Sequence, residues 1–328
     1  MAKHLSQAVD NLDVGRGLRD TQAGKLHLIT CRTHQAELLL VPSPELNDLI
    51  GGIIALYARK YSITIYAVCI LGNHYHLLVS GPEAILPTFA ANINREIARR
   101  TNWLLFRTGS LWARRYSDQV AIEQVDALEG LIYVITNPVH HGLVTHPRHW
   151  PGVNSYWQVL GEKPRVYSFI YYTEYHRAKR RAECRGEIVR REDYEIKTPL
   201  EIQPLPIFSE LSDKERIEQL GDLLEARTGE IVRRRRQDGK GFMGRREVLR
   251  QARRGSFPTE VKTTPQPSCY SKNPERIKEH RAEERQKRAW YDIASERFRS
   301  GDYGVEFPPY CFKPPLHYIP TETARGPT

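Results

Sequence analysis

The chain has 328 residues, of which 49 are Lys or Arg and 39 are Asp or Glu, giving a formal net charge of +10. Hydrophobic residues make up 40% of the chain and charged residues 27%, proportions typical of a soluble globular protein and not of a disordered one. The longest apolar stretch, residues 49–58, is too short for a membrane span, and the N-terminus lacks the apolar segment of a signal peptide. Five widely spaced cysteines without a CxxC pair argue against a disulfide scaffold, so we expect a cytoplasmic protein.

The first half of the chain shows a regular alternation of short apolar runs and amphipathic stretches. Strands are predicted at 26–33, 63–70 and 74–80, with a Gly72-Asn73 turn between the last two. Apolar spacing predicts a helix from Pro44, with Ser43 as its cap, and a second helix over about 85–97. A fourth strand region falls at 109–122, and a third helix begins near Val125.

This β-α-β-β-α-β order, followed by a helix, predicts an α+β fold for residues 21–160. The expected arrangement is ferredoxin-like, an antiparallel sheet with helices on one face. Residues 1–20 are expected to form an N-terminal tail. The fold alone does not decide the chemistry.

The second half, 161–328, is expected to be a basic extension, mostly helical or irregular. It holds 35 Lys or Arg against 27 Asp or Glu, whereas residues 1–160 hold 14 against 12. Helices are predicted at 212–228, opened by a Ser212-x-x-Glu215 capping box, and at 274–299. The basic half as a whole suggests an anionic partner, and the arginine-rich stretch 233–254 either binds backbone phosphates or forms a solvated arm.

The sharpest chemical feature is His74-Tyr75-His76. Alternate residues of a strand point to the same face, so both imidazoles would lie side by side and could hold a divalent metal. Alternatively, the two histidines lie on a solvated sheet face. In the third helix, Tyr133 and Asn137 are four residues apart and share a face, offering a phenol and an amide oxygen. Alternatively, Tyr133 is a core aromatic and Asn137 ends the helix before Pro138.

Three motifs in register resemble a known family. Residues 72–80, GNHYHLLVS, resemble the His–apolar–His signature of the HUH endonucleases, in the single-tyrosine transposases of the insertion-sequence-200 type. Residues 133–144 resemble the Y-I-x-x-N-P-V-x-x-G-L-V block of their REP-associated branch. Residues 111–116, LWARRY, are similar to the family's W-x-x-R-[FY] segment. The resemblance covers about residues 25–156, with Gly72 standing where the family commonly has proline.

The resemblance implies a transposase that cleaves and rejoins single-stranded or hairpin DNA through a 5′-phosphotyrosine intermediate. Tyr133 would be the nucleophile, and His74, His76 and Asn137 would hold Mg²⁺ or Mn²⁺. Arg114, Arg115 and Tyr116 would contact the DNA, by phosphate binding and base stacking; for the two arginines a solvated strand edge is the alternative. No nucleotide cofactor is expected, because the sequence has neither a P-loop nor a dinucleotide-binding motif.

Two further alternatives concern activity and assembly. A protein of this fold could bind DNA without cutting it, as a repressor or hairpin binder. The presence of His74, His76, Tyr133 and Asn137 together favours the active enzyme. Relatives of this kind occur as monomers and as homodimers, so either state is compatible with the resemblance.

Overall fold

A computed structural model describes Leu18, residues 22–252 and residues 268–314. The predicted N-terminal tail, apart from Leu18, lies outside the described residues, as do Arg253, Arg254 and the end of the chain from 315. Contacts divide the chain into two compact units, one of residues 22–272 and one of residues 1–21 with 273–328.

The larger unit begins with the predicted order of elements. These are β1 (His27–Arg32), α2 (Pro44–Lys60), β2 (Thr64–Ile70), β3 (His74–Ser80), α3 (Leu86–Leu104), β4 (Ser117–Ala121) and α4 (Gln124–His140). The predicted cap of α2 is present, since the Leu46 backbone N–H donates to Ser43 Oγ at 3.2 Å. Short helical turns lie between and after these elements: η1 (His34–Ala36), η2 (Pro147–His149) and α5 (Tyr156–Val159).

The main sheet has five strands in the order β2-β3-β1-β4-β7. Its first four strands pair antiparallel, which confirms the predicted α+β class with a largely antiparallel sheet. β7 (Cys269–Tyr270) adds to the edge, parallel to β4. The register places His76 opposite Thr30 on β1 and opposite Cys69 on β2.

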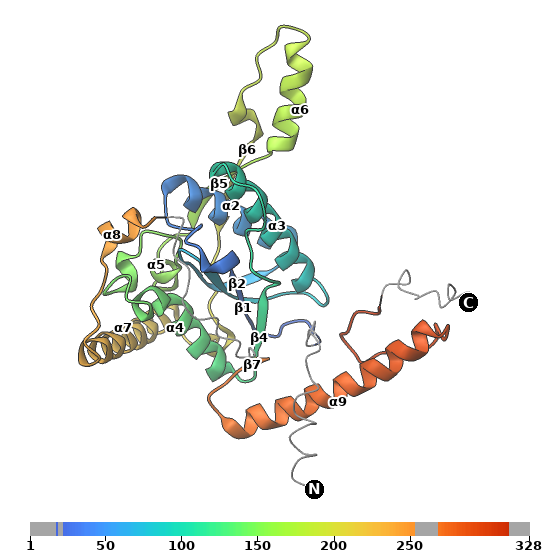
Figure 1. The fold of residues 1–328 in the computed structure, drawn as a ribbon. Coiled ribbons are helices and arrows are strands. Elements are labelled where there is room, and N and C mark those ends of the chain that lie inside the picture. Colours follow the sequence, from blue (N-terminus) through green and yellow to red (C-terminus); the bar gives the residue numbers. More distant parts are fainter. Residues whose placement is uncertain (1–17, 19–21, 253–267, 315–328) are drawn as a thin grey trace, which may run out of the picture. The chain divides into compact units, whose positions relative to one another are not determined.

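Helices cover both faces of this sheet, so the expectation of helices on one face is wrong (Figure 1). α2 and α3 pack over one face, with Ile53 and Ile93 fully buried. α4 packs over the other face, where Leu131 and Ile135 meet residues of β2 and β3. The physical reason lies in β2 and β3, whose residues are almost all buried and mostly apolar. Strands without a polar face must be covered on both sides.

Residues 161–252 contain strands that the sequence analysis missed. β5 (Arg165–Ile170) pairs antiparallel with β6 (Glu195–Leu200), and both pack against α2. The connection between them holds α6 (Tyr172–Glu183) and η3 (Arg191–Tyr194). Figure 1 shows α6 beyond the ends of β5 and β6. The strand pair is therefore part of the packed body, because Tyr167, Phe169 and Leu200 belong to the same core as α2 and α3.

The helix predicted at 212–228 is α7 (Asp213–Gln237), which follows η4 (Pro206–Phe208) and precedes α8 (Arg245–Arg250). Its predicted capping box between Ser212 and Glu215 is present. The predicted end before Gly229 is wrong, since the helix continues for two further turns. Packing explains the difference: Leu224 and Ile231 are buried in the core that α7 shares with α4, and this burial outweighs the low helix propensity of one glycine.

The smaller unit contains the predicted helix 274–299, which is α9 (Pro274–Arg299). Asn273 caps it by accepting hydrogen bonds from the backbone N–H groups of Glu275 and Arg276. A small apolar cluster of Ala294, Phe298 and Val305 packs at its C-terminal end. Across the part of the chain that the structure describes, every helix is too short or too polar to cross a bilayer.

Candidate active site

Strand β3 directs its two histidines toward α4. Tyr75, Leu77 and Val79 belong to the core under α2 and α3, whereas Leu78 belongs to the core under α4. His74 and His76 alternate with the first set and therefore lie on the α4 face. Their ring centroids are 4.9 Å apart, so the adjacency predicted from the sequence is present.

Helix α4 brings Tyr133 and Asn137 to the same place. The Tyr133 ring lies 5.2 Å from the ring of His76, measured between centroids. Asn137 is completely buried, and α4 continues past Pro138 to His140 instead of ending before the proline. Both side-chain atoms of Asn137 lack a hydrogen-bond partner, although the amide is close enough to influence the pKa values of His74 and Tyr133. A buried amide without partners is unfavourable by itself, which indicates a site for a ligand.

Hydrogen bonds fix the orientation of both imidazoles. Nδ1 of His74 lies 2.6 Å from Oδ1 of Asn73, and Nδ1 of His76 lies 2.7 Å from Oγ1 of Thr30. An amide oxygen only accepts, so His74 carries its proton on Nδ1 and leaves the lone pair on Nε2. Nε2 of His76 is buried and has no partner. Each ring therefore has one nitrogen held by the protein and the other available to a ligand.

The surroundings keep these groups uncharged at neutral pH. Burial, the neighbouring His141 and Arg32 together lower the pKa of His74 to about 3. Burial, followed by His74 and His141, also lowers the pKa of His76 well below its usual value. Burial raises the pKa of Tyr133 above its ordinary value. The imidazoles therefore present lone pairs, and the phenol retains its proton until a substrate or another charge reaches it.

Two arginines and a third histidine lie beside the site. Arg32 lies opposite His74 in the sheet, and the His141 ring is 5.3 Å from that of His74. On α7, the Arg235 guanidinium donates to the carbonyl of His140 at 3.1 Å. Burial, Arg32 and Arg235 all lower the pKa of His141. The position of Arg32 could have been predicted from the alternation of residues along β1. The position of Arg235 depends on the packing of α7 against α4, which no local sequence pattern reveals.

A second tyrosine was also missed. The ring of Tyr270, on β7, lies 6.3 Å from that of Tyr133. Nearby, Glu129 forms ion pairs with Arg227 at 3.0 Å and with Lys272 at 2.7 Å, which tie α4 to α7 and to the residues after β7. The short β7 strand has no sequence signature of its own, so its place beside α4 could not be expected.

The three residues predicted to contact DNA differ in their exposure. Arg114 and Arg115 are exposed, and they follow Ala113, whose N–H donates to the carbonyl of Arg32 at 2.9 Å. They therefore lie at the end of the sheet where His74 begins β3. Tyr116 is only 6% exposed and belongs to the core under α2 and α3. Its ring has no free face for a base, so burial argues against the expected stacking role.

Comparison with known proteins gives the family. The chain is 31% identical, over 120 residues, to a Haemophilus influenzae protein named as a REP-associated tyrosine transposase, and the match covers 32% of this chain and 68% of that protein. This chain belongs to the REP-associated tyrosine transposases. Among solved structures, it is similar to a REP-associated tyrosine transposase bound to a REP hairpin, with 19% identity and a TM-score of 0.38 over 45% of this chain and 87% of that one. No family model matches the chain.

The donor types at this site can be compared with those that a divalent metal requires. Within the described ranges, no three His, Cys, Asp or Glu side chains are arranged to hold a metal. The candidate set differs in kind, because it consists of two imidazoles and an amide. The buried atoms without partners, Nε2 of His76 and Oδ1 of Asn137, are donors that such an ion accepts.

Proposed function

We propose that this chain is a transposase that cleaves and rejoins single-stranded DNA, with Tyr133 as the nucleophile. The observation that carries the proposal is the position of the Tyr133 ring, 5.2 Å from His76 and on the same helical face as the buried, unpartnered Asn137. A phenol, two neutral imidazoles and a free amide share one site, and Arg32 lies opposite His74 in the sheet. Membership in the transposase family supports the same activity.

The reaction is a transfer between two oxygens at phosphorus. The Tyr133 oxygen attacks the scissile phosphate and releases its proton to solvent, and the bond from phosphorus to the 3′-oxygen breaks as that oxygen takes up a proton from solvent. The products are a 5′-phosphotyrosine link and a free 3′-hydroxyl. Attack of a 3′-hydroxyl on that link rejoins the DNA and restores the phenol. Because the covalent link retains the energy of the phosphodiester, the cycle requires no nucleotide cofactor.

His74, His76 and Asn137 would hold Mg²⁺ or Mn²⁺ in this proposal. When bound, such an ion supplies positive charge that polarises the scissile phosphate. The protein's own residues prepare the site: Thr30 and Asn73 orient the two rings, and burial keeps them neutral. Arg32 adds a fixed positive charge where the phosphate must approach.

The DNA partner and setting follow from the same proposal. We expect a hairpin-bearing substrate, as in the similar transposase bound to a REP hairpin. Arg114 and Arg115, exposed at the His74 end of the sheet, would contact its backbone phosphates. The strand order β2-β3-β1-β4 would represent the ferredoxin-like core of such enzymes. The reaction would take place in the cytoplasm, by a monomer or a homodimer.

A single-strand cleavage assay tests the proposal. Labelled DNA from the regions flanking the gene is incubated with the full chain and Mn²⁺ or Mg²⁺, and covalent adducts are separated by denaturing electrophoresis. We expect an adduct that requires the metal and disappears in Tyr133→Phe. Tyr270→Phe is the matched control, because it removes the neighbouring phenol, and it should retain the adduct.

Two other outcomes would contradict the proposal. An adduct that persists in Tyr133→Phe and disappears in Tyr270→Phe would show that Tyr270, and not Tyr133, is the nucleophile. Tight binding of hairpin DNA without any adduct would leave the alternative function, a DNA-binding protein that does not cut.

A further inference from the structure

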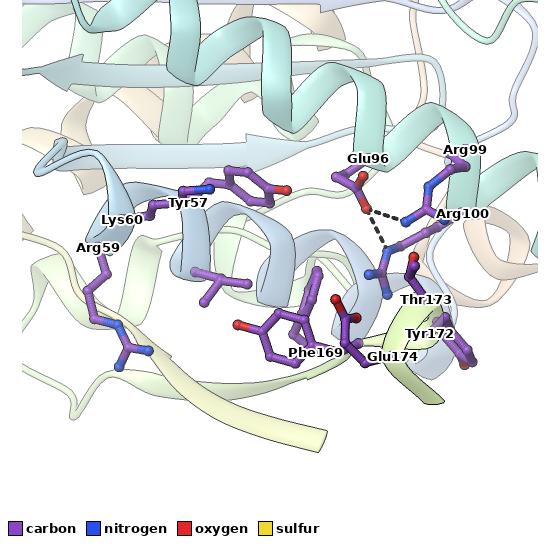
Figure 2. A pocket seen from close by; sticks show the side chains of 12 residues that line it. Tyr57, Arg59, Lys60, Glu96, Arg99, Arg100, Phe169, Tyr172, Thr173 and Glu174 are labelled. Carbon is purple, nitrogen blue, oxygen red and sulfur yellow. Dashed lines mark hydrogen bonds and ion pairs between the residues drawn. The ribbon is translucent and has the colours of Figure 1, made fainter. Parts of the chain in front are cut away.

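A cationic and aromatic pocket lies on the side of the sheet away from Tyr133. It has a volume of about 540 Å³ and is formed by the C-terminal halves of α2 and α3 together with the junction of β5 and α6. We call it the α2–α3 pocket. Its lining includes Tyr57, Arg59, Lys60, Arg99, Phe169 and Tyr172. Figure 2 shows Arg59 and Lys60 at one end of the pocket and Arg99 and Arg100 at the other.

The cations at the two ends differ in their partners. Glu96 accepts hydrogen bonds from Arg99 at 2.8 Å and from Arg100 at 3.1 Å, which neutralise its charge (Figure 2). The Arg100 guanidinium also lies 4.0 Å from the centre of the Phe169 ring, so its role is structural. Arg59 and Lys60, in contrast, are exposed and form no ion pair with any described residue. Lys60 Nζ also lies 5.6 Å from the centre of the Tyr57 ring and 5.4 Å from that of the Tyr61 ring, contacts that leave its charge unneutralised.

Exposed aromatic rings continue from the pocket. Trp103, at the end of α3, is 65% exposed and lies 5.6 Å from Tyr172. Tyr171 is 38% exposed. The row then follows α6 through His176, 5.9 Å from Tyr172, to Tyr175. Large rings normally avoid water, so a row of partly exposed rings beside unpaired cations indicates a binding surface.

The first helical turns beyond the pocket add further charge. α6 carries four exposed cations that make no ion pair with the described part of the chain: Arg177, Lys179, Arg180 and Arg181. They lie on the same element as Tyr172 and Tyr175. Cations that follow a backbone, alternating with rings that stack on bases, are the combination found in proteins that bind single strands.

We propose that the α2–α3 pocket and the adjoining face of α6 form a second binding site for single-stranded nucleic acid. Arg59 and Lys60 bind backbone phosphates, and Tyr171 and Tyr172 stack on bases. An acidic peptide would use the cations but not the exposed rings, so it fits the surface less well. The identification of the strand as DNA rests on the proposed function, whereas the chemistry of the pocket does not.

The test measures binding of fluorescein-labelled dT20 to the full chain by anisotropy, in EDTA, over a series of salt concentrations. A parallel series with rU20 distinguishes DNA from RNA. Arg59→Gln/Lys60→Gln is compared with Lys163→Gln/Lys214→Gln, which removes the same charge from exposed lysines outside the pocket. The pocket variant should bind about tenfold more weakly or worse at 0.1 M salt, and the slope of log K against log salt should fall by about 1.4. The control should bind within about twofold of the original chain.

Stacking is tested by Tyr171→Ala and Tyr171→Phe. We expect Tyr171→Ala to weaken binding by about fivefold or more, and Tyr171→Phe, which keeps the ring, to bind normally. Equal binding by the pocket and lysine variants would overturn the inference, as would binding of a poly-glutamate peptide that competes with dT20 without responding to Tyr171→Ala. Thermal melting confirms that each variant is folded.

Failure of this inference is distinguishable from failure of the proposed function. If the original chain forms a covalent adduct and the pocket variant binds dT20 normally, only the second site is wrong. If the original chain forms no adduct but the pocket variant loses dT20 binding, the second site stands and the cleavage mechanism does not.

Discussion

A single hydroxyl determines how His76 is presented at the candidate active site. Thr30 Oγ1 lies 2.7 Å from Nδ1 of His76, so the opposite nitrogen, Nε2, is the one left without a partner on a ring that lies 5.2 Å from the Tyr133 ring. Neither the metal nor the DNA needs to touch Thr30 for this effect. Thr30 is therefore a positioning residue.

Replacing this hydroxyl should weaken metal-dependent cleavage. We expect Thr30→Val to reduce cleavage by about 10- to 100-fold and to raise the Mn²⁺ concentration needed for half-maximal rate. The matched control is Thr198→Val, a buried strand residue whose hydroxyl has no partner, and it should leave both quantities unchanged. A Thr30→Val protein with the original Mn²⁺ dependence would show that His76 does not depend on this hydrogen bond.

Glu96, in the wall of the α2–α3 pocket, makes the stability of the fold depend on pH. Burial raises its pKa, but hydrogen bonds from Arg99 and Arg100 outweigh burial and lower the pKa below the ordinary value. The folded protein then binds fewer protons than the unfolded chain at acidic pH. The stabilisation is present above the ordinary carboxyl pKa and is lost as the pH falls through the folded value.

Glu96→Gln should therefore destabilise the protein by about 1–3 kcal/mol at pH 7, because Arg100 loses its charged partner. The difference in Tm from the original chain should shrink as the pH falls from about 5 to about 3. Glu174→Gln, at an exposed position of the same pocket, should leave Tm unchanged at both pH values. A difference for Glu96→Gln that stays constant with pH would refute the assignment.

Residues with a fixed local spacing could be predicted, and those brought in by packing could not. The i, i+2 pair His74 and His76 and the i, i+4 pair Tyr133 and Asn137 follow from strand and helix geometry. That the two pairs meet at one site could be predicted only from the family resemblance, because the spacing within one pair does not show where the other pair lies. Tyr116 illustrates the opposite case, because an aromatic beside two arginines does not reveal which side of the strand faces the core.

Among the elements, helix α2 approaches strand β5 unusually closely. A Cβ atom added at Gly52 would overlap the Ser168 carbonyl oxygen, and one added at Gly51 would overlap the Tyr167 ring. The two glycines therefore set the distance between helix and strand pair. This also explains why glycines occur in the middle of an otherwise apolar helix.

Gly52→Ala should lower the free energy of unfolding by about 1–3 kcal/mol, because backbone atoms of β5 would have to move. Gly221→Ala, on α7, is the matched control: its added Cβ would meet Leu160 Cδ2 at 3.8 Å, an ordinary contact. That change should stabilise the protein slightly, by up to about 1 kcal/mol. Urea unfolding measures both, and equal effects of the two changes would refute the close approach.

Elements with strong periodicity or caps were predicted with nearly correct bounds, as α2, β3 and α9 show. β5 and β6 were missed because each is only six residues long and neither RVYSFI nor EIKTPL sustains a regular alternation of apolar and polar residues. The end of α7 was misplaced because Gly229 signals a terminus locally, whereas burial of Ile231 beside α4 extends the helix.

For the molecule as a whole, both cores draw on residues from either side of position 160. Tyr167 and Leu200 complete the core under α2 and α3, and Leu220 and Leu224 complete the core under α4. The division into a catalytic domain of 21–160 and an extension remains a prediction. The compact unit defined by contacts runs from 22 to 272 instead.

Truncated chains distinguish the predicted boundary at residue 160 from the compact unit that ends at residue 272. Residues 22–272 should unfold in one cooperative transition when expressed alone, because both cores are complete. Residues 22–160 should show no cooperative transition and should aggregate, because the missing side chains expose apolar surface on α2 and α4. Circular dichroism during heating measures both. A cooperative melt of 22–160 would instead support the boundary predicted from the sequence.

The two-sided burial of β2 and β3 has a consequence for how this protein can diverge. A substitution almost anywhere between 64 and 80 disturbs one core or the other, so this hairpin tolerates few changes. The stretch 171–194, with α6, is mostly exposed and joins two strands that pair without it. Mutations there leave the folded body intact. Side chains in this connection can therefore change without disturbing either core.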